Sequence, residues 1–274
     1  MNLPFVKMQA LGNDFVVLDG HHPLPPLEPA LLRRLADRRL GVGCDQILVV
    51  DPPPSAEVDF GYRIFNADGS AVGQCGNGAR CLARYVVQRG LTQASHIRIQ
   101  TASTTMQAEL SDDDLVSVQM AVPDFSPQSL PLRRPLAVSY DFAGQKFWAV
   151  SMGNPHLVTQ VADVDKAPLE QWGPEWSGPS ADLPEGANVG VVQVLAPDQV
   201  RLRVFERGAG ETPACGSGAC AAVACLVQHG VLEADQPVTV ALRGGSLVIR
   251  WAGGDRPLWM TGPAHWVFEG SWRT

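Results

Sequence analysis

Two cysteines stand in near-identical glycine-rich turns, 140 residues apart in a chain of 274 residues. Cys75-Gly76-Asn77-Gly78-Ala79 aligns without a gap to Cys215-Gly216-Ser217-Gly218-Ala219. Each cysteine directly precedes a predicted helix, whose first amides lack partners within the helix and form an anion site with the helix dipole. The same field favours a thiolate. Two such turns facing each other are expected to hold one carboxylate, with a thiol on each side of its α-carbon. One thiolate then removes the α-proton and the opposite thiol returns a proton, which inverts the carbon.

The similarity between the halves extends beyond these turns. Downstream, Val87-Gln88 and Gly90 align with Val227-Gln228 and Gly230, and upstream Arg63 and Phe65 align with Arg203 and Phe205. Two further pairs keep nearly the same offset, namely Gly12-Asn13 with Gly153-Asn154 and Gln46 with Asn188. Self-similarity on this scale indicates a duplicated unit. We expect the two copies to pack about a pseudo-two-fold axis, each presenting one cysteine to the other.

The hydrophobic pattern predicts strands around one long helix in each half. The helices over 76–89 and 216–228 end at glycines, and both are apolar nearly all round, which is typical of a buried helix. The predicted fold class is α+β, with two pseudo-symmetric domains, each a curved mixed sheet or barrel wrapped round a central helix. The domains are predicted as 1–118 plus 262–274, carrying Cys75, and 119–261, carrying Cys215. Beyond these, a helix is expected over 30–39, a Pro/Gly-rich loop over 172–184, and strands over 15–19, 46–50, 60–66, 96–101, 105–110, 115–120, 147–161 with a break, 188–195, 199–206, 238–242, 246–251, 258–261 and 266–269.

Composition argues against several classes of function. The net charge is −7 and the basic residues form no tract longer than an arginine pair, which disfavours binding to nucleic acid or to an anionic membrane. No segment approaches the about 18 consecutive apolar residues of a membrane span, and the first residues do not resemble a signal peptide. We therefore expect a cytoplasmic protein whose six cysteines are reduced thiols.

The sequence disfavours three other uses of these residues. A zinc site would pair closely spaced cysteines with His-x₃₋₅-His; Cys215 and Cys220 are separated by four residues, with glycines between them, but no such histidine pair accompanies them. A thioredoxin-like protein would need Cys-x-x-Cys, which is absent from the sequence. A pyridoxal-phosphate enzyme needs a Schiff-base lysine, and Lys7, Lys146 and Lys166 have no phosphate-binding context. No metal and no cofactor is therefore expected. Each signature cysteine by itself could be a small buried hydrophobe, which is the interpretation we give to the four unpaired ones, Cys44, Cys81, Cys220 and Cys225.

Long stretches around both cysteines resemble the signature blocks of the diaminopimelate epimerase family. They are Cys75-Gly76-Asn77-Gly78-Ala79-Arg80-Cys81 and the run from Phe205-Glu206-Arg207-Gly208 to Cys215-Gly216-Ser217-Gly218-Ala219-Cys220, together with Leu11-Gly12-Asn13-Asp14-Phe15 and Gly153-Asn154-Pro155-His156. The resemblance spans nearly the whole chain. It implies a pyridoxal-independent isomerase that interconverts LL- and meso-diaminopimelate for lysine and cell-wall precursor synthesis. The nearest alternative is a proline or hydroxyproline racemase, which would lack Glu206-Arg207 before the second cysteine.

The resemblance also implies roles for individual residues. Cys75 and Cys215 are the expected acid/base pair, and His156 and Glu206 are expected to tune the pKa values of the thiols. Arg207 can offer a bidentate fork to the distal carboxylate of the substrate, and the asparagines can offer amide oxygens to its ammonium group. We expect diaminopimelate as the small-molecule partner and a homodimer as the assembly. The full set of expected substrate contacts is Asn13, Gln46, Asn66, Gly76, Asn77, Asn154, Asn188, Glu206, Arg207, Gly216 and Ser217.

Overall fold

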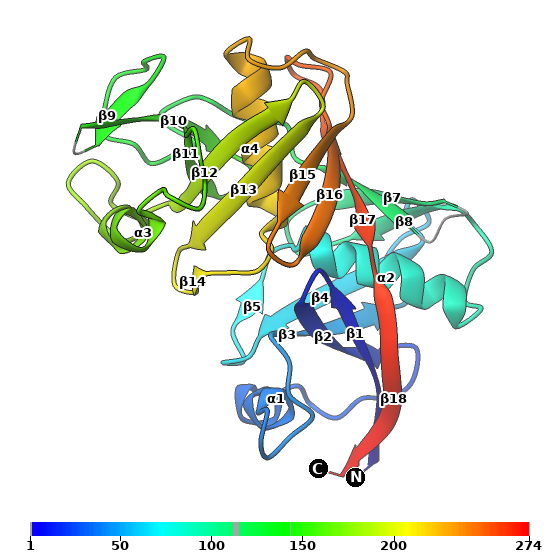
Figure 1. The fold of residues 1–274 in the computed structure, drawn as a ribbon. Coiled ribbons are helices and arrows are strands. Elements are labelled where there is room, and N and C mark those ends of the chain that lie inside the picture. The colour runs from blue at the N-terminus through cyan, green and yellow to red at the C-terminus, as the bar shows by residue number, and fades with distance from the viewer. Residues whose placement is uncertain (1, 112–114, 143, 274) are drawn as a thin grey trace. The chain divides into compact units, whose positions relative to one another are not determined.

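The computed structural model describes residues 2–111, 115–142 and 144–273, and these divide into two compact units. The first unit comprises residues 1–119 and 261–274, and the second comprises residues 120–260. Each unit is a mixed β-sheet with two helices, so the fold class is α+β (Figure 1). None of the helices in the described ranges is long and apolar enough to cross a membrane.

The described part of the first unit contains nine strands and two helices. Its strands are β1 (Asn2–Ala10), β2 (Asn13–Asp19), β3 (Gln46–Asp51), β4 (Phe60–Asn66), β5 (Ala71–Val72), β6 (His96–Gln100), β7 (Thr105–Leu110), β8 (Leu115–Met120) and β18 (His265–Arg273). Its helices are α1 (Pro29–Ala36) and α2 (Gly76–Gln88). The last strand returns to the first, since β18 pairs antiparallel with β1, beside which it runs in Figure 1.

The second unit repeats this arrangement. Its strands are β9 (Tyr140–Phe142), β10 (Gln145–Ser151), β11 (Pro155–Gln160), β12 (Asn188–Ala196), β13 (Gln199–Glu206), β14 (Gly210–Glu211), β15 (Val238–Leu242) and β16 (Gly245–Arg250). Strand β17 (Leu258–Pro263) begins in the second unit and ends in the first. Its helices are α3 (Leu169–Ser177) and α4 (Gly216–Gln228).

Strand pairing supports the duplication inferred from the sequence. In the first unit, the β1–β2 hairpin is followed by β3 parallel to β2, β4 antiparallel to β3, and β6 parallel to β4. In the second unit, the β10–β11 hairpin is followed by β12 parallel to β11, β13 antiparallel to β12, and β15 parallel to β13. Short strands β5 and β14 pair back onto β4 and β13 just before the long helices. The two halves therefore share one topology as well as one sequence pattern.

Each long helix is buried within its own sheet. Ten of the residues of α2 are buried, and the helix packs against β1, β2, β3, β7 and β18. Helix α4 buries a nearly continuous run from Gly218 to Leu226 and packs against β10, β11, β12, β13 and β16. Gly90 and Gly230 follow these helices with φ of 70° and 69°, the left-handed conformation that glycine adopts without strain. Each long helix is therefore packed among the strands of its own unit and is followed by a glycine that allows the chain to turn away.

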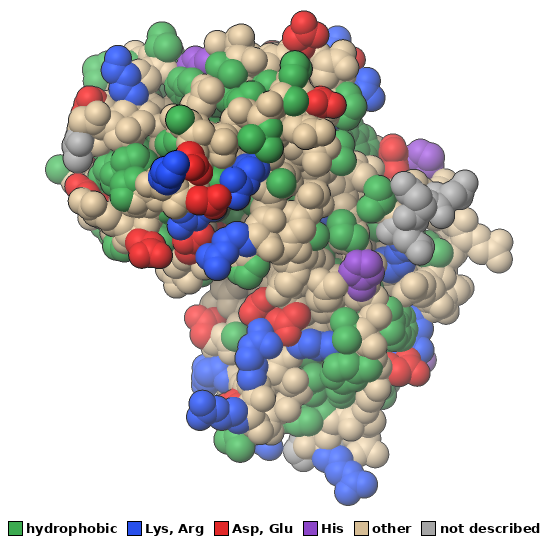
Figure 2. Space-filling model, in the orientation of Figure 1, with side chains coloured by type: hydrophobic (Ala, Val, Ile, Leu, Met, Phe, Trp, Pro, Cys, Tyr) green, Lys and Arg blue, Asp and Glu red, His purple; other side chains and the backbone are tan. Residues whose placement is uncertain are grey.

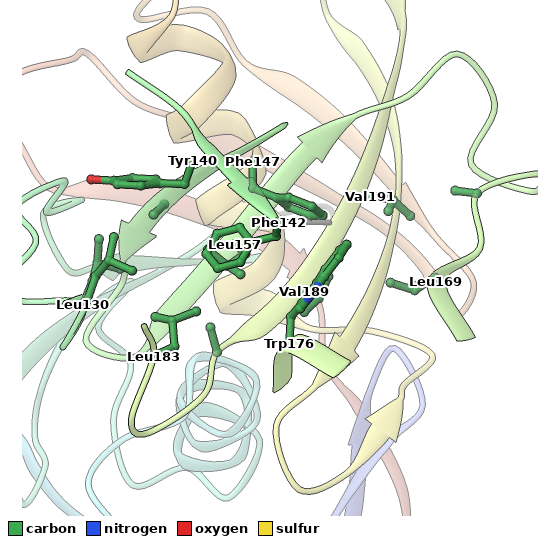
Figure 3. Close-up of a cluster of buried hydrophobic side chains, with 14 of the residues drawn as sticks. Leu130, Tyr140, Phe142, Phe147, Leu157, Leu169, Trp176, Leu183, Val189 and Val191 are labelled. Atoms are coloured by element: carbon green, nitrogen blue, oxygen red, sulfur yellow. The ribbon is translucent and has the colours of Figure 1, made fainter. Parts of the chain in front are cut away.

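An aromatic core stabilises the second unit beside its site strands (Figure 3). Phe147 and Trp176 meet edge to face with ring centroids 4.6 Å apart, a favourable geometry for aromatic pairs. Trp176 belongs to α3, which ends at Ser177, so the loop predicted over 172–184 was wrong for residues 172–177 and right for residues 178–184. Pro174 and Gly173 interrupt the helical pattern in the sequence. Gly173 is needed here because a β-carbon would lie 2.2 Å from the Phe205 ring on β13.

Other element boundaries also differ from the predictions. β1 was not predicted, although it is a nine-residue strand between β2 and β18. β18 runs over nine residues where a short strand was expected, and α1 ends at Ala36, three residues before the predicted end. On the face shown in Figure 2, acidic and basic side chains are interspersed and form no single basic patch.

Candidate active site

Both signature cysteines occupy the N-cap positions of the long helices. Cys75 caps α2 and Cys215 caps α4, each with an extended backbone. The carbonyl groups of both cysteines accept the first helical hydrogen bond, from Ala79 and Ala219 at 2.9 and 3.0 Å. The two glycine-rich turns thus have the same local structure. Cys75 is partly exposed, whereas Cys215 is buried.

The Cys75 turn is held by a tyrosine that the sequence argument did not single out. The Tyr62 hydroxyl on β4 donates a hydrogen bond to the Cys75 carbonyl oxygen at 3.2 Å. The same hydroxyl lies against Gly78, where a β-carbon would come within 2.2 Å of it. Burial raises the pKa of Tyr62 well above its ordinary value, and the nearby Cys75 and Cys81 add to the rise, so the hydroxyl keeps its proton as a donor. In the sequence, this role is indicated by no more than the position of Tyr62, whose side chain is at a buried position of a strand.

Four of the predicted polar residues of the first unit form hydrogen-bonded pairs. Gln46 Nε2 donates to Asn66 Oδ1 at 3.0 Å, because the antiparallel register of β3 and β4 sets these residues opposite each other. Asn77 Nδ2 donates to Asn13 Oδ1 at 3.2 Å. Asn13 follows the tight β1–β2 turn, in which Leu11 and Gly12 both have positive φ, 56° and 85°. That turn directs the chain so that Asn13 reaches the first turn of α2.

The Cys215 turn differs from the Cys75 turn because a carboxylate, that of Glu206, contacts the sulfur. Cys215 Sγ donates to Glu206 Oε2 at 3.1 Å, and the Thr212 hydroxyl donates to the other oxygen of Glu206. Ser217 Oγ lies 3.6 Å from the same sulfur. By the repeat offset of 140 residues, the position that matches Glu206 is Asn66. One thiol of the pair therefore contacts a carboxylate, whereas the matching position in the other half carries a neutral amide.

The pKa of Cys215 is raised, contrary to the expectation that the helix start lowers it. Burial raises the pKa well above its ordinary value, and the charge of Glu206 and the hydrogen bond to it raise it further. The Ser217 hydroxyl and the Gly218 amide favour the thiolate, but their effect is smaller. Cys215 is therefore a protonated thiol at neutral pH, because burial disfavours the charged form more than the first turn of the helix stabilises it.

His156 occupies the centre of a polar cluster in the second unit. Its Nε2 lies 3.1 Å from Asn154 Oδ1, 3.2 Å from Ser217 Oγ and 3.4 Å from Asn188 Nδ2. The parallel register of β11 and β12 sets His156 beside Asn188. Burial lowers the pKa of His156 to about 3, and the charge of Arg207 adds to the effect, so the ring is neutral at physiological pH. His156 thus reaches Cys215 through Ser217 rather than by direct contact.

Arg207 lies at the exposed edge of this cluster. Its backbone amide donates to Asn188 Oδ1 at 2.8 Å, which ties the loop after β13 to β12. Its guanidinium donates to the Glu185 carbonyl oxygen at 2.8 Å and lies 3.8 Å from a carboxylate oxygen of Glu185. The side chain is 41 % exposed, so this cation can exchange its present contacts for those of an anionic ligand.

The other thiols differ from the signature pair. Cys44, Cys81, Cys220 and Cys225 are all buried. Burial is the main reason that the pKa values of Cys44 and Cys81 are both raised to about 12. No group of three or more potential metal ligands was found among the residues described. Each signature turn therefore carries a thiol beside the first-turn amides of its own helix, and the turn of the second unit adds the carboxylate of Glu206; such groups suit proton transfer next to a bound carboxylate.

Comparison with known structures shows which proteins share this fold. The fold matches a phenazine biosynthesis protein of the PhzF family from Bacillus anthracis, with a TM-score of 0.71, 15 % identity and 99 % of each chain covered. It also matches a hydroxyproline epimerase from Agrobacterium vitis, with a TM-score of 0.70, 15 % identity, and 98 % of this chain and 92 % of the other covered. The chain thus has the two-unit α+β fold shared by these proteins.

Sequence comparison identifies the family among proteins of this fold. The diaminopimelate epimerase family model matches residues 5–125 and 148–267. A diaminopimelate epimerase from Laribacter hongkongensis (strain HLHK9) is 51 % identical over 275 residues, covering 98 % of this chain and 99 % of the relative. The chain belongs to the diaminopimelate epimerase family, and it is an isomerase of the amino-acid epimerase type.

Proposed function

We propose that this enzyme interconverts LL- and meso-diaminopimelate by proton transfer at one α-carbon, as a step in lysine and cell-wall precursor synthesis. The observation that carries the proposal is the 51 % identity to a diaminopimelate epimerase across nearly the full length of both chains. Two cysteines in matching helix-start turns supply chemistry that fits this reaction.

In the proposed mechanism, the two units are domains that each contribute one thiol to a single site. Cys215 is the acid in the ligand-free enzyme because burial and Glu206 keep it protonated. Cys75 then serves as the base on the opposite face of the α-carbon. For the reverse reaction the roles exchange: Cys75 carries the proton that is delivered to the carbon, and Cys215 acts as the thiolate base. Glu206 Oε2, at 3.1 Å from Cys215 Sγ, is placed to accept the proton that Cys215 gives up. Each thiol serves one face, so neither can replace the other.

The reacting carboxylate is proposed to bind at the first turns of α2 and α4, against Gly76, Asn77, Gly216 and Ser217. Amide groups there stabilise the negative charge that develops on the carboxylate as the α-proton leaves. His156, as a neutral ring, holds Ser217 at 3.2 Å and so affects Cys215 through that hydroxyl.

The distal amino-acid end of the substrate is assigned to the remaining polar residues. Arg207 pairs with the distal carboxylate after giving up its contacts with Glu185. A polar cage of this kind rejects analogues that leave its groups unpaired. Asn13, Gln46, Asn66, Asn154, Asn188 and Glu206 supply the other contacts.

We further propose a homodimer in the cytoplasm that needs no metal or organic cofactor. Exposed apolar side chains on β18, Val267 at 54 % and Phe268 at 47 %, support a self-associating surface. Light scattering coupled to size exclusion measures the mass, and a monomer at micromolar concentration would contradict the dimer.

The activity itself is tested by incubating the purified chain with LL-diaminopimelate and separating the stereoisomers by chiral chromatography. The expected result is an approach to equilibrium with the meso form, without added pyridoxal phosphate. L-Proline and trans-4-hydroxy-L-proline are the control substrates. Turnover of either control without turnover of diaminopimelate would assign the enzyme to the imino-acid racemases instead.

A further inference from the structure

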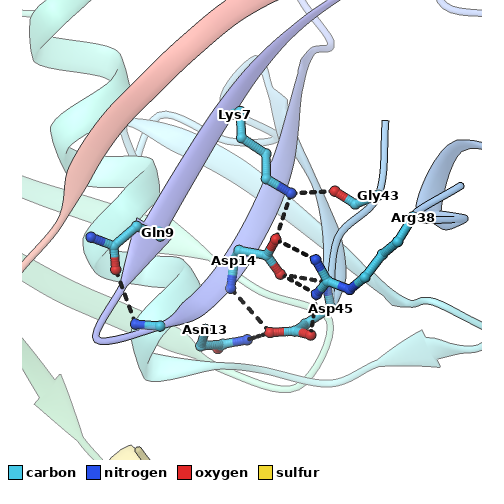
Figure 4. A network of polar contacts seen from close by, with 8 residues as sticks. Lys7, Gln9, Asn13, Asp14, Arg38, Gly43 and Asp45 are labelled. Atoms are coloured by element: carbon cyan, nitrogen blue, oxygen red, sulfur yellow. Dashed lines mark hydrogen bonds and ion pairs between the residues drawn. The ribbon is translucent and has the colours of Figure 1, made fainter. Parts of the chain in front are cut away.

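A chain of hydrogen bonds joins two of the proposed substrate-binding amides, those of Asn77 and Asn13, to charged residues. Figure 4 shows the part of this chain from Asn13 to Asp45, Arg38 and Asp14. Arg80 Nη2 donates to Asn77 Oδ1 at 2.9 Å. Asn77 Nδ2 donates to Asn13 Oδ1 at 3.2 Å, and Asn13 Nδ2 donates to Asp45 Oδ2 at 3.1 Å. The four residues therefore form one relay with a single direction of donation, from Arg80 to Asp45.

The two ends of the relay fix its direction. A guanidinium can only donate hydrogen bonds and an ionised carboxylate can only accept them, whereas an asparagine amide can do both. An amide between such ends has one satisfied orientation, because turning it over sets donor against donor or acceptor against acceptor. Asn77 and Asn13 are thereby held with defined positions for amino group and carbonyl.

Asp45 is itself fixed by the residues around it. Its Oδ1 accepts from Arg38 Nη2 at 2.7 Å, and its Oδ2 also accepts from the Asp14 backbone amide at 3.1 Å. Arg38 in turn grips both oxygens of Asp14, at 2.9 and 2.7 Å. Both carboxylate oxygens of Asp45 thus meet donors, and Oδ2 meets the amide of Asn13.

The anchor behind Asp45 is firmly ionised. Burial of Asp14 opposes its charge, but hydrogen bonds from Arg38 and Lys7 outweigh burial and hold the pKa of Asp14 well below its ordinary value. Lys7 Nζ lies 2.6 Å from Asp14 Oδ2 and also donates to the Gly43 carbonyl oxygen. Arg38 is therefore held in place by Asp14 at neutral pH.

We propose that Asp45 is a positioning residue that sets the orientation of the Asn13 and Asn77 amides for substrate binding. The inference rests on the proposed function, because it assumes that these two amides meet the substrate. Asp45 acts through Asn13 and does not contact the reacting atoms.

Asparagine at position 45 has nearly the same shape as aspartate but offers one acceptor oxygen in place of two. One of its two terminal atoms is an amino group, which faces either Arg38 or Asn13 and repels that donor. Only one of these two neighbours then keeps its acceptor. With the amino group facing Asn13, the Asn13 amide is no longer held in one orientation; with the amino group facing Arg38, the contact that fixes position 45 is lost. Glutamate keeps two acceptor oxygens, and Asp45 is exposed enough, at 46 %, for one more methylene group to fit.

The experiment compares Asp45→Asn and Asp45→Glu with a matched control, Asp59→Asn. Asp59 also accepts from a backbone amide and pairs with an arginine, Arg98, but it contacts no proposed site residue. Epimerisation of diaminopimelate gives kcat and KM, and thermal unfolding gives the stability of each variant. We expect kcat/KM of Asp45→Asn to fall about tenfold or more, since a hydrogen bond to a charged group is worth at least that factor. Asp45→Glu should retain more activity than Asp45→Asn, and Asp59→Asn should match the wild type.

Four outcomes would contradict the proposal or its basis. Equal kcat/KM for Asp45→Asn and Asp59→Asn overturns the positioning role. Higher activity for Asp45→Asn than for Asp45→Glu, or an activity loss that merely follows loss of folded protein, makes Asp45 a residue of shape and stability only. A wild-type chain that does not epimerise diaminopimelate refutes the proposed function instead, so the two failures are distinguishable.

Discussion

Replacing Gly78 by alanine probes the packing that fixes the Cys75 turn. A β-carbon at this position would lie 2.2 Å from the Tyr62 hydroxyl and 3.1 Å from Leu48 Cδ2. Tyr62 is buried and its hydroxyl donates to the Cys75 carbonyl, so it cannot move aside without losing that bond. Overpacking costs about 1–3 kcal/mol, and a contact this short belongs near the upper end. The ordinary gain from alanine over glycine in a helix, about 0.5–1 kcal/mol, offsets part of that cost.

The net destabilisation is therefore about 2 kcal/mol, or a fall in Tm of roughly 4–8 °C for a chain of this size. Tyr62→Phe serves as the partner variant, because it removes the hydroxyl and leaves the ring carbon at an ordinary 3.4 Å. Alone, Tyr62→Phe should cost about 1 kcal/mol for the lost hydrogen bond. The double variant should be about as stable as Tyr62→Phe, which is a strongly non-additive result. Urea unfolding of the four proteins measures this cycle, and equal costs of Gly78→Ala in both backgrounds would refute the reasoning.

Three further predictions follow from the second unit. Gly218→Ala should lower kcat even in the fully folded variant, because its β-carbon would lie 3.2 Å from Cys215 Sγ and 2.9 Å from Val204 Cγ2. Steady-state kinetics measures kcat and thermal unfolding measures the stability of the variant. An unchanged kcat would contradict the prediction. Stability should decline as the pH falls from about 6.5 towards 3, because the unfolded chain binds a proton at His156 in that window and the folded chain does not. The slope should approach about 1.4 kcal/mol per pH unit and flatten in His156→Gln, as urea unfolding at several pH values can test. Arg207→Lys should lower kcat/KM for diaminopimelate about tenfold, since lysine keeps the charge but not the planar fork, and unchanged kinetics would remove Arg207 from the site.

Much of the fold could be predicted because the relevant signals are local. The pattern of glycines and apolar residues placed α2 and α4 to within a residue, and β4, β7, β8, β13 and β15 have the predicted bounds. β1 was missed because its pairing partners, β2 and β18, stabilise it from opposite ends of the chain. α3 was missed because Pro174 and Gly173 look like loop residues, although tertiary packing of Trp176 on Phe147 holds the helix.

The sequence could also predict which residues to propose for the site, because the signals for them are local motifs. The duplicated turns and the signature blocks single out the cysteines and the amides beside them. The supporting contacts came only from the structure, since those of Tyr62 with Cys75, Thr212 with Glu206 and Asp45 with Asn13 are set by strand register or by loop geometry. The sign of the Cys215 pKa shift was also beyond the sequence, because it depends on how deeply the sulfur is buried and on its 3.1 Å contact with Glu206.

The central claim is that Cys75 and Cys215 act on opposite faces of one α-carbon. It is tested most directly by following α-deuterium in both stereoisomers during the reaction of LL-diaminopimelate in D₂O, with the wild type, Cys75→Ala and Cys215→Ala. Early in the wild-type reaction, the meso product should carry solvent deuterium at the inverted carbon while the remaining LL substrate does not, and neither variant should form meso product. Equal early labelling of substrate and product, or inversion by either alanine variant, would contradict the two-thiol mechanism.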